Sequence, residues 1–161
     1  MLNIFIRKLV NLFNSIHQRS TYELIYQKYG VSERFFFQGV DSEVYGDGEF
    51  KVGQNSYCGN RCAFQTAIGY EIKIGSNVAI SHNVRIYTSN RSSQYITVGK
   101  EPKYSFGSVS IGDNVWIGAN VFIKEGVIIG DNVVIGANSV VTKNVGSKSI
   151  IGGVPAKALN K

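Results

Sequence analysis

Histidine is the side chain best suited to proton transfer near neutral pH, and the sequence has two, His17 and His82. One chain therefore lacks the three imidazoles that a trihistidine metal site requires. The two cysteines, Cys58 and Cys62, are too few for a four-thiolate zinc site or a disulfide framework, so we expect no metal and a reducing cytosol. A lone histidine in a turn is commonly a solvated surface residue, so the surroundings of His82 decide whether it is a candidate general base.

The chain has 161 residues, which is the size of one domain with a substantial core. Hydrophobic residues make up 43% and charged residues 17%, a composition that excludes a disordered chain. The net charge of +6 favours an anionic partner: a phosphorylated cofactor or substrate, a membrane surface or nucleic acid. The aromatic residues do not alternate with basic ones in any nucleic-acid-binding module, so we expect no nucleic-acid partner.

A repeat of six residues is the strongest pattern in the sequence. From Ile111 it reads IGDNVW, IGANVF, IKEGVI, IGDNVV, IGANSV and VTKNVG, and looser hexads begin at Val52 and Ile74. The first position is always apolar, and the fourth is usually Asn or Gly, which tolerate a left-handed backbone. Each hexad thus predicts a short strand and a turn, and three hexads form a coil of eighteen residues. We therefore expect an all-β solenoid of stacked parallel strands around an apolar core.

The repeat is interrupted once, and the interruption lies close to His82. Ile74 and Ile111 are 37 residues apart, which is one coil plus an insertion of nineteen residues within about 88–108. Such an insertion is either a functional loop or a spacer. The repeat register stacks His82 next to Ala119 and Ala119 next to Ala137, and two small side chains in line leave a shallow groove. A groove and a loop beside the imidazole make His82 a candidate catalytic residue.

The N-terminal region has helical spacing. Its apolar residues recur every three or four positions, at Leu2, Phe5, Leu9, Leu12 and Ile16. This pattern predicts an amphipathic helix over 2–16, and a second helix is expected over 21–29 with its end at Gly30. The apolar stripe packs on the protein, on a sister subunit or, with its basic residues, on a membrane surface. We divide the chain into a helical segment (1–39), a β-helix (40–154) with an inserted loop (88–108), and a tail (155–161).

The segment VWIGANVFIKEGVIIGDNVVIGANSVVTKNV, followed by IIGGVPAK, resembles the hexapeptide-repeat acyltransferases. The likeness extends from about Val40 to the C-terminus. It is strongest to O-acetyltransferases of sugars and surface polysaccharides, and maltose, galactoside and serine acetyltransferases are more distant. The resemblance implies a left-handed parallel β-helix, a homotrimer and acetyl-coenzyme A bound as co-substrate between neighbouring prisms.

The resemblance also implies roles for individual residues. Ala119 and Ala137 would lie beside the pantetheine arm of the cofactor, and Lys143 and Lys157 would lie near its phosphates, although either lysine could simply be solvated. Trp116 matches a tryptophan that stands near the acceptor in relatives. An exposed tryptophan indicates a ligand or a subunit contact, and the sequence leaves both open.

One departure from the family pattern concerns the catalytic base. Relatives place a histidine a few residues after a strand, in a T-x-x-H pattern, but here the stretch is IYTSNRSS, with Arg91 at that place or Asn90 after a shift of one residue. For a hydroxyl acceptor, His82 would be the base, with Arg91 binding the acceptor. For an amine acceptor, Asn90 could orient the amine while a backbone N–H holds the thioester oxygen.

Acetyl transfer from acetyl-coenzyme A to a sugar hydroxyl is the function that these features favour. The acceptor would be a bacterial surface polysaccharide, such as a capsule or O-antigen, or its precursor. A sugar-nucleotide N-acetyltransferase and a non-catalytic scaffold subunit are the alternatives. A γ-type carbonic anhydrase would share the prism but needs three histidines, so it is excluded.

Overall fold

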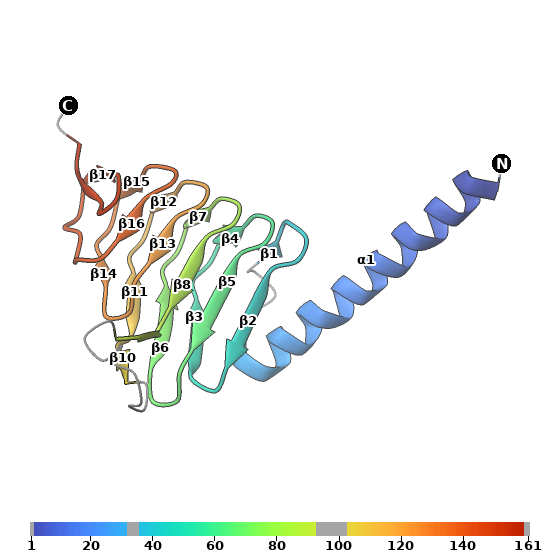
Figure 1. Ribbon diagram of the computed structural model, residues 1–161, viewed down its shortest axis with the longest axis horizontal. Helices are drawn as coiled ribbons and strands as arrows, with labels where there is room; N and C mark the ends of the chain where they lie inside the picture. The colour runs from blue at the N-terminus through green and yellow to red at the C-terminus, as the bar shows by residue number, and fades with distance from the viewer. Residues whose placement is uncertain (1, 32–35, 93–102, 160–161) are drawn as a thin grey trace, which may run out of the picture.

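The computed structural model describes residues 2–31, 36–92 and 103–159, which form a three-sided prism with a long helix at its N-terminal end (Figure 1). Each side is a sheet of parallel strands. Face A contains β1 (Phe36–Phe37), β4 (Tyr57–Cys58), β7 (Ala79–Ile80), β12 (Trp116–Ile117), β15 (Val134–Ile135) and β17 (Ile150–Gly152). Face B contains β2 (Glu43–Gly46), β5 (Ala63–Thr66), β8 (Arg85–Tyr87), β13 (Phe122–Ile123) and β16 (Val140–Val141). Face C contains β3 (Glu49–Val52), β6 (Glu71–Ile74), β11 (Val109–Ile111) and β14 (Ile128–Ile129).

The chain runs from face A to face B to face C and back, and it winds a left-handed parallel β-helix. The predicted register is confirmed, because Ile80 pairs with Ile117 and Ile117 pairs with Ile135 on face A. The apolar column of the hexads points inward and forms the core, and its isoleucines from Ile74 to Ile135 are at most 2% exposed. The periodicity therefore predicted both the fold and its core.

The turns between faces use the expected backbone. The asparagines with positive φ, between 56° and 59°, are Asn55, Asn77, Asn83, Asn114, Asn120, Asn132 and Asn138. Asn144 belongs to the same sequence column but does not share this conformation, and its side-chain oxygen accepts a hydrogen bond from the amide of Ile128. Stacked asparagines also bond to one another, as Asn83 does to Asn120 (2.8 Å) and Asn120 to Asn138 (3.0 Å). These ladders tie successive coils together.

One helix, α1 (Leu2–Tyr29), replaces the two helices that we expected. Residues 17–20 contain neither glycine nor proline, so no residue there breaks the helix. The predicted end is confirmed, with Gly30 at φ 60°. Only the C-terminal half packs on the prism, where Ile25 is buried and the hydroxyls of Tyr22 and Tyr29 donate to the carbonyls of Gly39 and Gly46, both at 2.9 Å. No helix among the described residues is long and apolar enough to cross a membrane.

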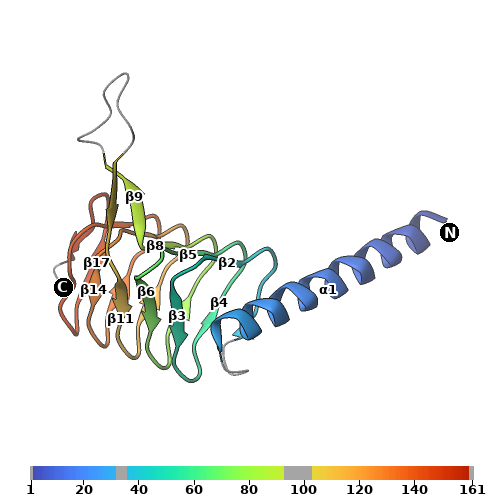
Figure 2. The same cartoon turned by 90° about the horizontal axis from the view of Figure 1, so that it is seen from below.

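The insertion leaves the prism as a hairpin between faces B and C (Figure 2). Its strands β9 (Ser89–Arg91) and β10 (Tyr104–Phe106) pair antiparallel, with Asn90 opposite Ser105. Residues 93–102 of the predicted loop lie outside the described residues. At the far end, β18 (Lys157–Ala158) turns back and pairs antiparallel with β17. We call the turns between the faces the A–B, B–C and C–A corners.

Candidate functional site

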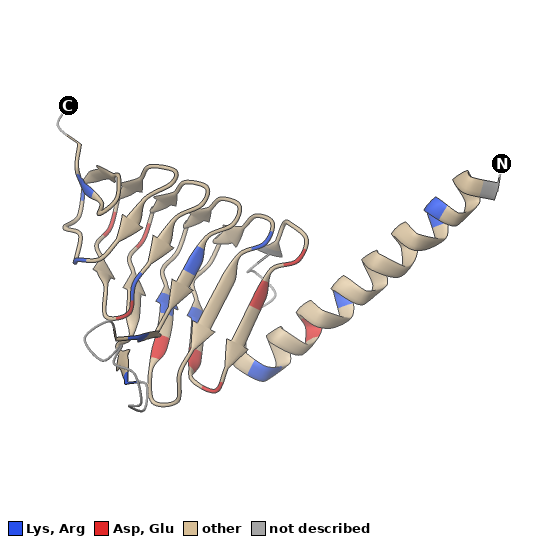
Figure 3. Cartoon of the chain, viewed as in Figure 1, with Lys and Arg blue, Asp and Glu red and all other residues tan. Residues whose placement is uncertain are grey.

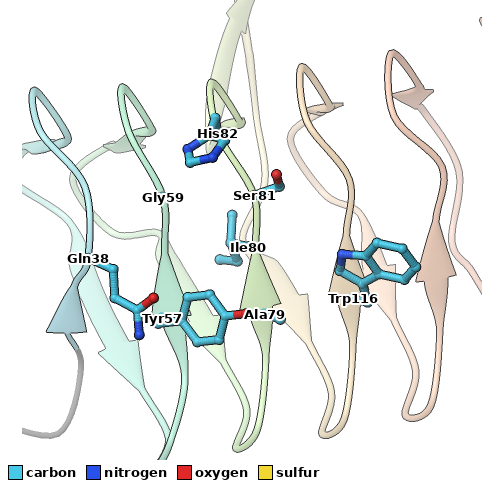
Figure 4. A pocket seen from close by; sticks show the side chains of 8 residues that line it. All are labelled: Gln38, Tyr57, Gly59, Ala79, Ile80, Ser81, His82 and Trp116. Carbon is cyan, nitrogen blue, oxygen red and sulfur yellow. The ribbon is translucent and has the colours of Figure 1, made fainter.

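A pocket of about 300 Å³ opens on face A, beside the A–B corner. Its walls are two aromatic rings, those of Tyr57 and Trp116, and its floor is Ala79 between them, because Ala79 pairs with both residues across adjacent strands (Figure 4). Gln38, Gly59, Ile80, Ser81 and His82 complete the lining. Trp116 is 58% exposed, so its ring is free to contact a ligand or another subunit. Two of the predicted site residues, His82 and Trp116, therefore line one pocket.

His82 is fixed by the backbone of the preceding coil. Its Nδ1 accepts a hydrogen bond from the amide of Asn60 at 2.9 Å. The imidazole lies against Gly59, where any Cβ would collide with the ring. Since Nδ1 accepts this hydrogen bond, the neutral imidazole carries its proton on Nε2. In this state His82 offers the pocket an N–H donor, and it becomes a base only when the hydrogen bond to Asn60 is broken.

The A–B corner continues from His82 towards the C-terminal coils. The carbonyl of His82 accepts from the amide of Asn120 at 3.0 Å, and the carbonyl of Ala119 accepts from the amide of Asn138 at 2.8 Å. These bonds confirm that His82, Ala119 and Ala137 follow one another along the corner. Ala119 is half-buried and Ala137 is exposed, so a thin ligand could lie along this line. Such a line suits an extended chain that bonds to backbone groups.

The lysines assigned to the cofactor lie apart from each other. Lys157 is exposed on β18 and pairs with Gly152, which is in register with Gly136, one residue before the position of Ala137 at the A–B corner. Lys143 is exposed in the turn after β16, which is at the B–C corner. Of these two lysines, Lys157 is the one that lies near the end of the line formed by His82, Ala119 and Ala137 of the same chain.

A buried carboxylate anchors the inserted hairpin at the B–C corner. The side chain of Glu125 is 3% exposed and accepts hydrogen bonds from the Asn90 amide and from the Ser105 hydroxyl, the latter at 2.6 Å. Lys124 forms an ion pair with it at 2.8 Å. Burial by itself raises the pKa of the Glu125 carboxyl, but hydrogen bonds from Lys124, Ser105 and Asn90 outweigh burial and hold the pKa below its ordinary value. The side-chain amide of Asn90 therefore holds the hairpin to Glu125.

Glu125 was not among the predicted site residues, although its place in the repeat could be read from the sequence. Glu125 falls in the turn one coil after the insertion, so stacking alone places it under the base of the hairpin. Asp113 and Asp131 occupy the same hexad position, so the signal that could have identified Glu125 is its place one coil after the insertion rather than its acidity.

The predicted catalytic residues are not brought together within one chain. His82 lies at the A–B corner, and Asn90 and Arg91 lie on β9 at the B–C corner, with face B between them (Figure 2). Arg91 is exposed on the hairpin. No group of three or more histidine, cysteine or acidic residues suited to a metal occurs among the residues that the structure describes.

A left-handed prism of hexapeptide coils is the architecture of the hexapeptide-repeat transferases. The family model described as bacterial transferase hexapeptide (six repeats) matches residues 108–143. A maltose O-acetyltransferase from Clostridium difficile 630 is 32% identical, with a TM-score of 0.73 over 98% of this chain and 84% of that chain. The chain therefore belongs to the hexapeptide-repeat acyltransferases, and it is an acetyltransferase.

Two further structures share the fold. A hexapeptide-repeat acetyltransferase from Vibrio cholerae O1 biovar eltor, complexed with acetyl-coenzyme A, is 28% identical with a TM-score of 0.67, over 87% of this chain and 75% of that chain. An N-acyltransferase from Bacillus cereus shares the fold at 20% identity, with a TM-score of 0.62 over 81% of this chain and 78% of that chain. None of the curated proteins that were compared matches this chain.

Proposed function

We propose that this acetyltransferase moves an acetyl group from acetyl-coenzyme A to a hydroxyl of a sugar in a bacterial surface polysaccharide or its precursor. The observation that carries the proposal is the pocket on face A, where Tyr57 and Trp116 stand on either side of Ala79 beside His82. Aromatic rings bind the apolar faces of sugar rings, and the polar tips of Tyr57 and Gln38 can bind hydroxyls. A maltose O-acetyltransferase among the similar structures supports a sugar acceptor.

The A–B corner is the proposed site of acetyl-coenzyme A. The small side chains of Ala119 and Ala137 leave room for the pantetheine arm, and Lys157 at the end of this line is placed to meet the phosphates. The relative from Vibrio cholerae with bound acetyl-coenzyme A supports this donor. In this arrangement the thioester end would reach His82.

The division of the site between two corners supports a homotrimer. If face B turns towards a threefold axis, the A–B corner of one subunit meets the B–C corner of its neighbour. The hairpin that Asn90 anchors, with Arg91 on it, and Lys143 would then lie beside the neighbour's His82 and cofactor, although they lie far from the His82 of their own chain. Face B suits such a contact, because Tyr45, Tyr87 and Phe122 form an aromatic row along it.

Acetyl-coenzyme A supplies a thioester whose carbon the acceptor oxygen attacks, and the C–S bond then breaks. His82 would take the hydroxyl proton on Nε2 and return it to the leaving thiolate. This role requires His82 to release the Asn60 amide and present an unprotonated Nε2. One hydrogen bond of this kind contributes about 1 kcal/mol, and Asn60 is partly exposed, so water can replace it.

A second candidate is transfer to an amino group of a sugar. The hydrogen bond at Nδ1 of His82 favours it, because an amine that is already partly deprotonated needs no strong base. His82 would then donate its Nε2–H to the thioester oxygen, where negative charge develops.

Thiol release from acetyl-coenzyme A distinguishes these candidates. The acceptors are a panel of surface glycans and amino-sugar nucleotides, and the variants are His82→Asn and His17→Asn. Asparagine at position 82 keeps an acceptor for the Asn60 amide but removes the imidazole. We expect release with a hydroxyl acceptor, a loss of about 100-fold or more in kcat for His82→Asn, and no change for His17→Asn. Equal activity of His82→Asn and the unsubstituted protein would contradict the assigned base, and turnover of amines alone would favour the second candidate.

A further inference from the structure

The helix α1 has two opposed sides. Its C-terminal half packs on the prism through Tyr22, Ile25, Tyr26 and Tyr29. Its N-terminal half exposes a row of large apolar side chains, and five of them lie close together around the helix axis: Phe5 (60%), Leu9 (50%), Leu12 (57%), Phe13 (70%) and Ile16 (56%). At 100° per residue the centres of the two sets lie about 130° apart around the helix axis. The apolar row therefore cannot fold against the prism while the tyrosines keep their contacts.

The N-terminal half also extends away from the prism, as both views show (Figures 1 and 2). Nothing among the described residues of this chain covers its apolar row. The charges on the same half indicate which partner from outside the chain would fit this row.

The charges of this half are of one sign. Arg7, Lys8 and Arg19 are exposed on the polar side, and the first acidic residue is Glu23, close to the prism (Figure 3). At 100° per residue, Lys8 and Arg19 lie at one edge of the apolar row, and Arg7 lies on the opposite side of the helix. An apolar row whose edge and polar side carry only cations is typical of helices that lie in the interface of an anionic membrane.

We propose that residues 3–19 of α1 bind to an anionic phospholipid surface, with the apolar row in the lipid, Lys8 and Arg19 at the phosphates, and Arg7 adding to the positive charge from the opposite side of the helix. The prism is then held above the membrane by the tyrosine side of the same helix. This inference is independent of which acceptor the enzyme acetylates.

The competing occupant is a bundle of the same helices from other copies of the chain. The row has the three-and-four spacing of such a bundle, but Ile6, Val10 and Phe13 widen it beyond two positions per heptad, and all three are about half exposed or more. Bundled copies would also bring Lys8 and Arg19 to the edges of the contact, with no acidic residue among residues 3–19 to pair them. The charge therefore favours lipid.

Sedimentation with vesicles tests the proposal on the full chain. One set contains phosphatidylcholine with a quarter phosphatidylglycerol, and the other contains phosphatidylcholine alone. We expect binding to the anionic vesicles that is at least tenfold tighter than to the neutral ones and that weakens with salt. The variant Leu9→Asp should lower this binding at least tenfold, and the triple variant Arg7→Gln, Lys8→Gln, Arg19→Gln should do the same.

The matched control is Ile68→Asp, which adds the same charge at an apolar side chain that is 76% exposed on the prism. It should bind anionic vesicles as the unsubstituted protein does. Circular dichroism and light scattering on each variant show whether the helix and the oligomer are kept. Absence of vesicle binding, equal binding by Leu9→Asp, or a fall in oligomer mass with Leu9→Asp in a protein that ignores vesicles would overturn the proposal.

Discussion

The A–B and B–C corners of the prism are built from the same repeat but differ in what interrupts them. The A–B corner is regular, and its asparagines bond in sequence from Asn83 to Asn120 to Asn138 beside the groove of small residues. The B–C corner carries the inserted hairpin, which Glu125 holds through Asn90 and Ser105. The regular corner supplies a straight line for a ligand, and the interrupted corner supplies side chains that reach beyond the prism. The proposed site needs both kinds of corner.

The largest expected effect comes from combining the two corners in different chains. His82→Asn and Asn90→Asp should each be nearly inactive, the second because a new carboxylate faces Glu125 and detaches the hairpin. Trimers of the two variants, co-expressed with different tags, should regain about a quarter of full activity, because a shared site is intact with a probability of one half for each chain. Thiol release from acetyl-coenzyme A measures the activity of the mixed trimers. Trimers no more active than either variant would mean that the corners do not act together between subunits.

The anchor of the hairpin should affect stability in a pH-dependent way. Glu125→Gln removes an ion whose folded pKa lies below its ordinary value, and charged hydrogen bonds of this kind contribute about 2 kcal/mol. The ionised carboxylate therefore stabilises the fold above the unfolded pKa, and this contribution is lost as the pH falls through the folded pKa. Urea unfolding should give a steeper decline below pH 5 for the unsubstituted protein than for Glu125→Gln. Parallel curves would show that the carboxylate contributes no pH dependence.

The small-residue line at the A–B corner should be sensitive to bulk. Ala137→Leu should raise the KM for acetyl-coenzyme A about tenfold, or about 1.4 kcal/mol, with little change in kcat. The control Gln54→Leu puts the same side chain on an exposed position of the C–A corner, and its KM should not change. Equal KM values for both variants would place the cofactor elsewhere.

The smallest effect concerns the ladder at the same corner. Asn120→Gly keeps a backbone that tolerates φ 59° but removes the side-chain bonds to Asn83 and Asn138, which should lower the free energy of unfolding by about 1 kcal/mol. Asn120→Ala should cost about 1 kcal/mol more, because alanine adds strain at positive φ. Thermal or urea unfolding measures both. If the glycine variant were less stable than the alanine variant, backbone strain at position 120 would not explain the difference between the two variants.

The regular part of the molecule was predictable from the sequence. An inward apolar residue every six positions leaves one way to stack the coils, and this fixed the neighbours of His82, Ala119 and Ala137 and the exposure of Trp116. The same regularity does not predict which hydrogen bonds are made by side chains outside the inward-facing apolar column. The hydrogen bond from Asn60 to Nδ1 depends on the rotation of one ring, and the use of Asn90 by Glu125 depends on how a hairpin folds back. Continuity of α1 was missed because apolar spacing changes at residue 17 while helix propensity does not.

The antiparallel return of β18 onto β17 has a consequence for how the molecule can grow. The last coil of a parallel stack leaves unpaired the backbone groups that every earlier coil pairs with the next one, so another chain could join there and the assembly could lengthen into a fibre. With β18 on that rung, and Tyr22 of α1 stacked on Phe37 at the first one, both ends are occupied by the chain's own terminal segments. Because both ends of the prism are capped, the protein remains a discrete particle. The prism itself could be longer or shorter only through the insertion or deletion of whole coils between these two ends.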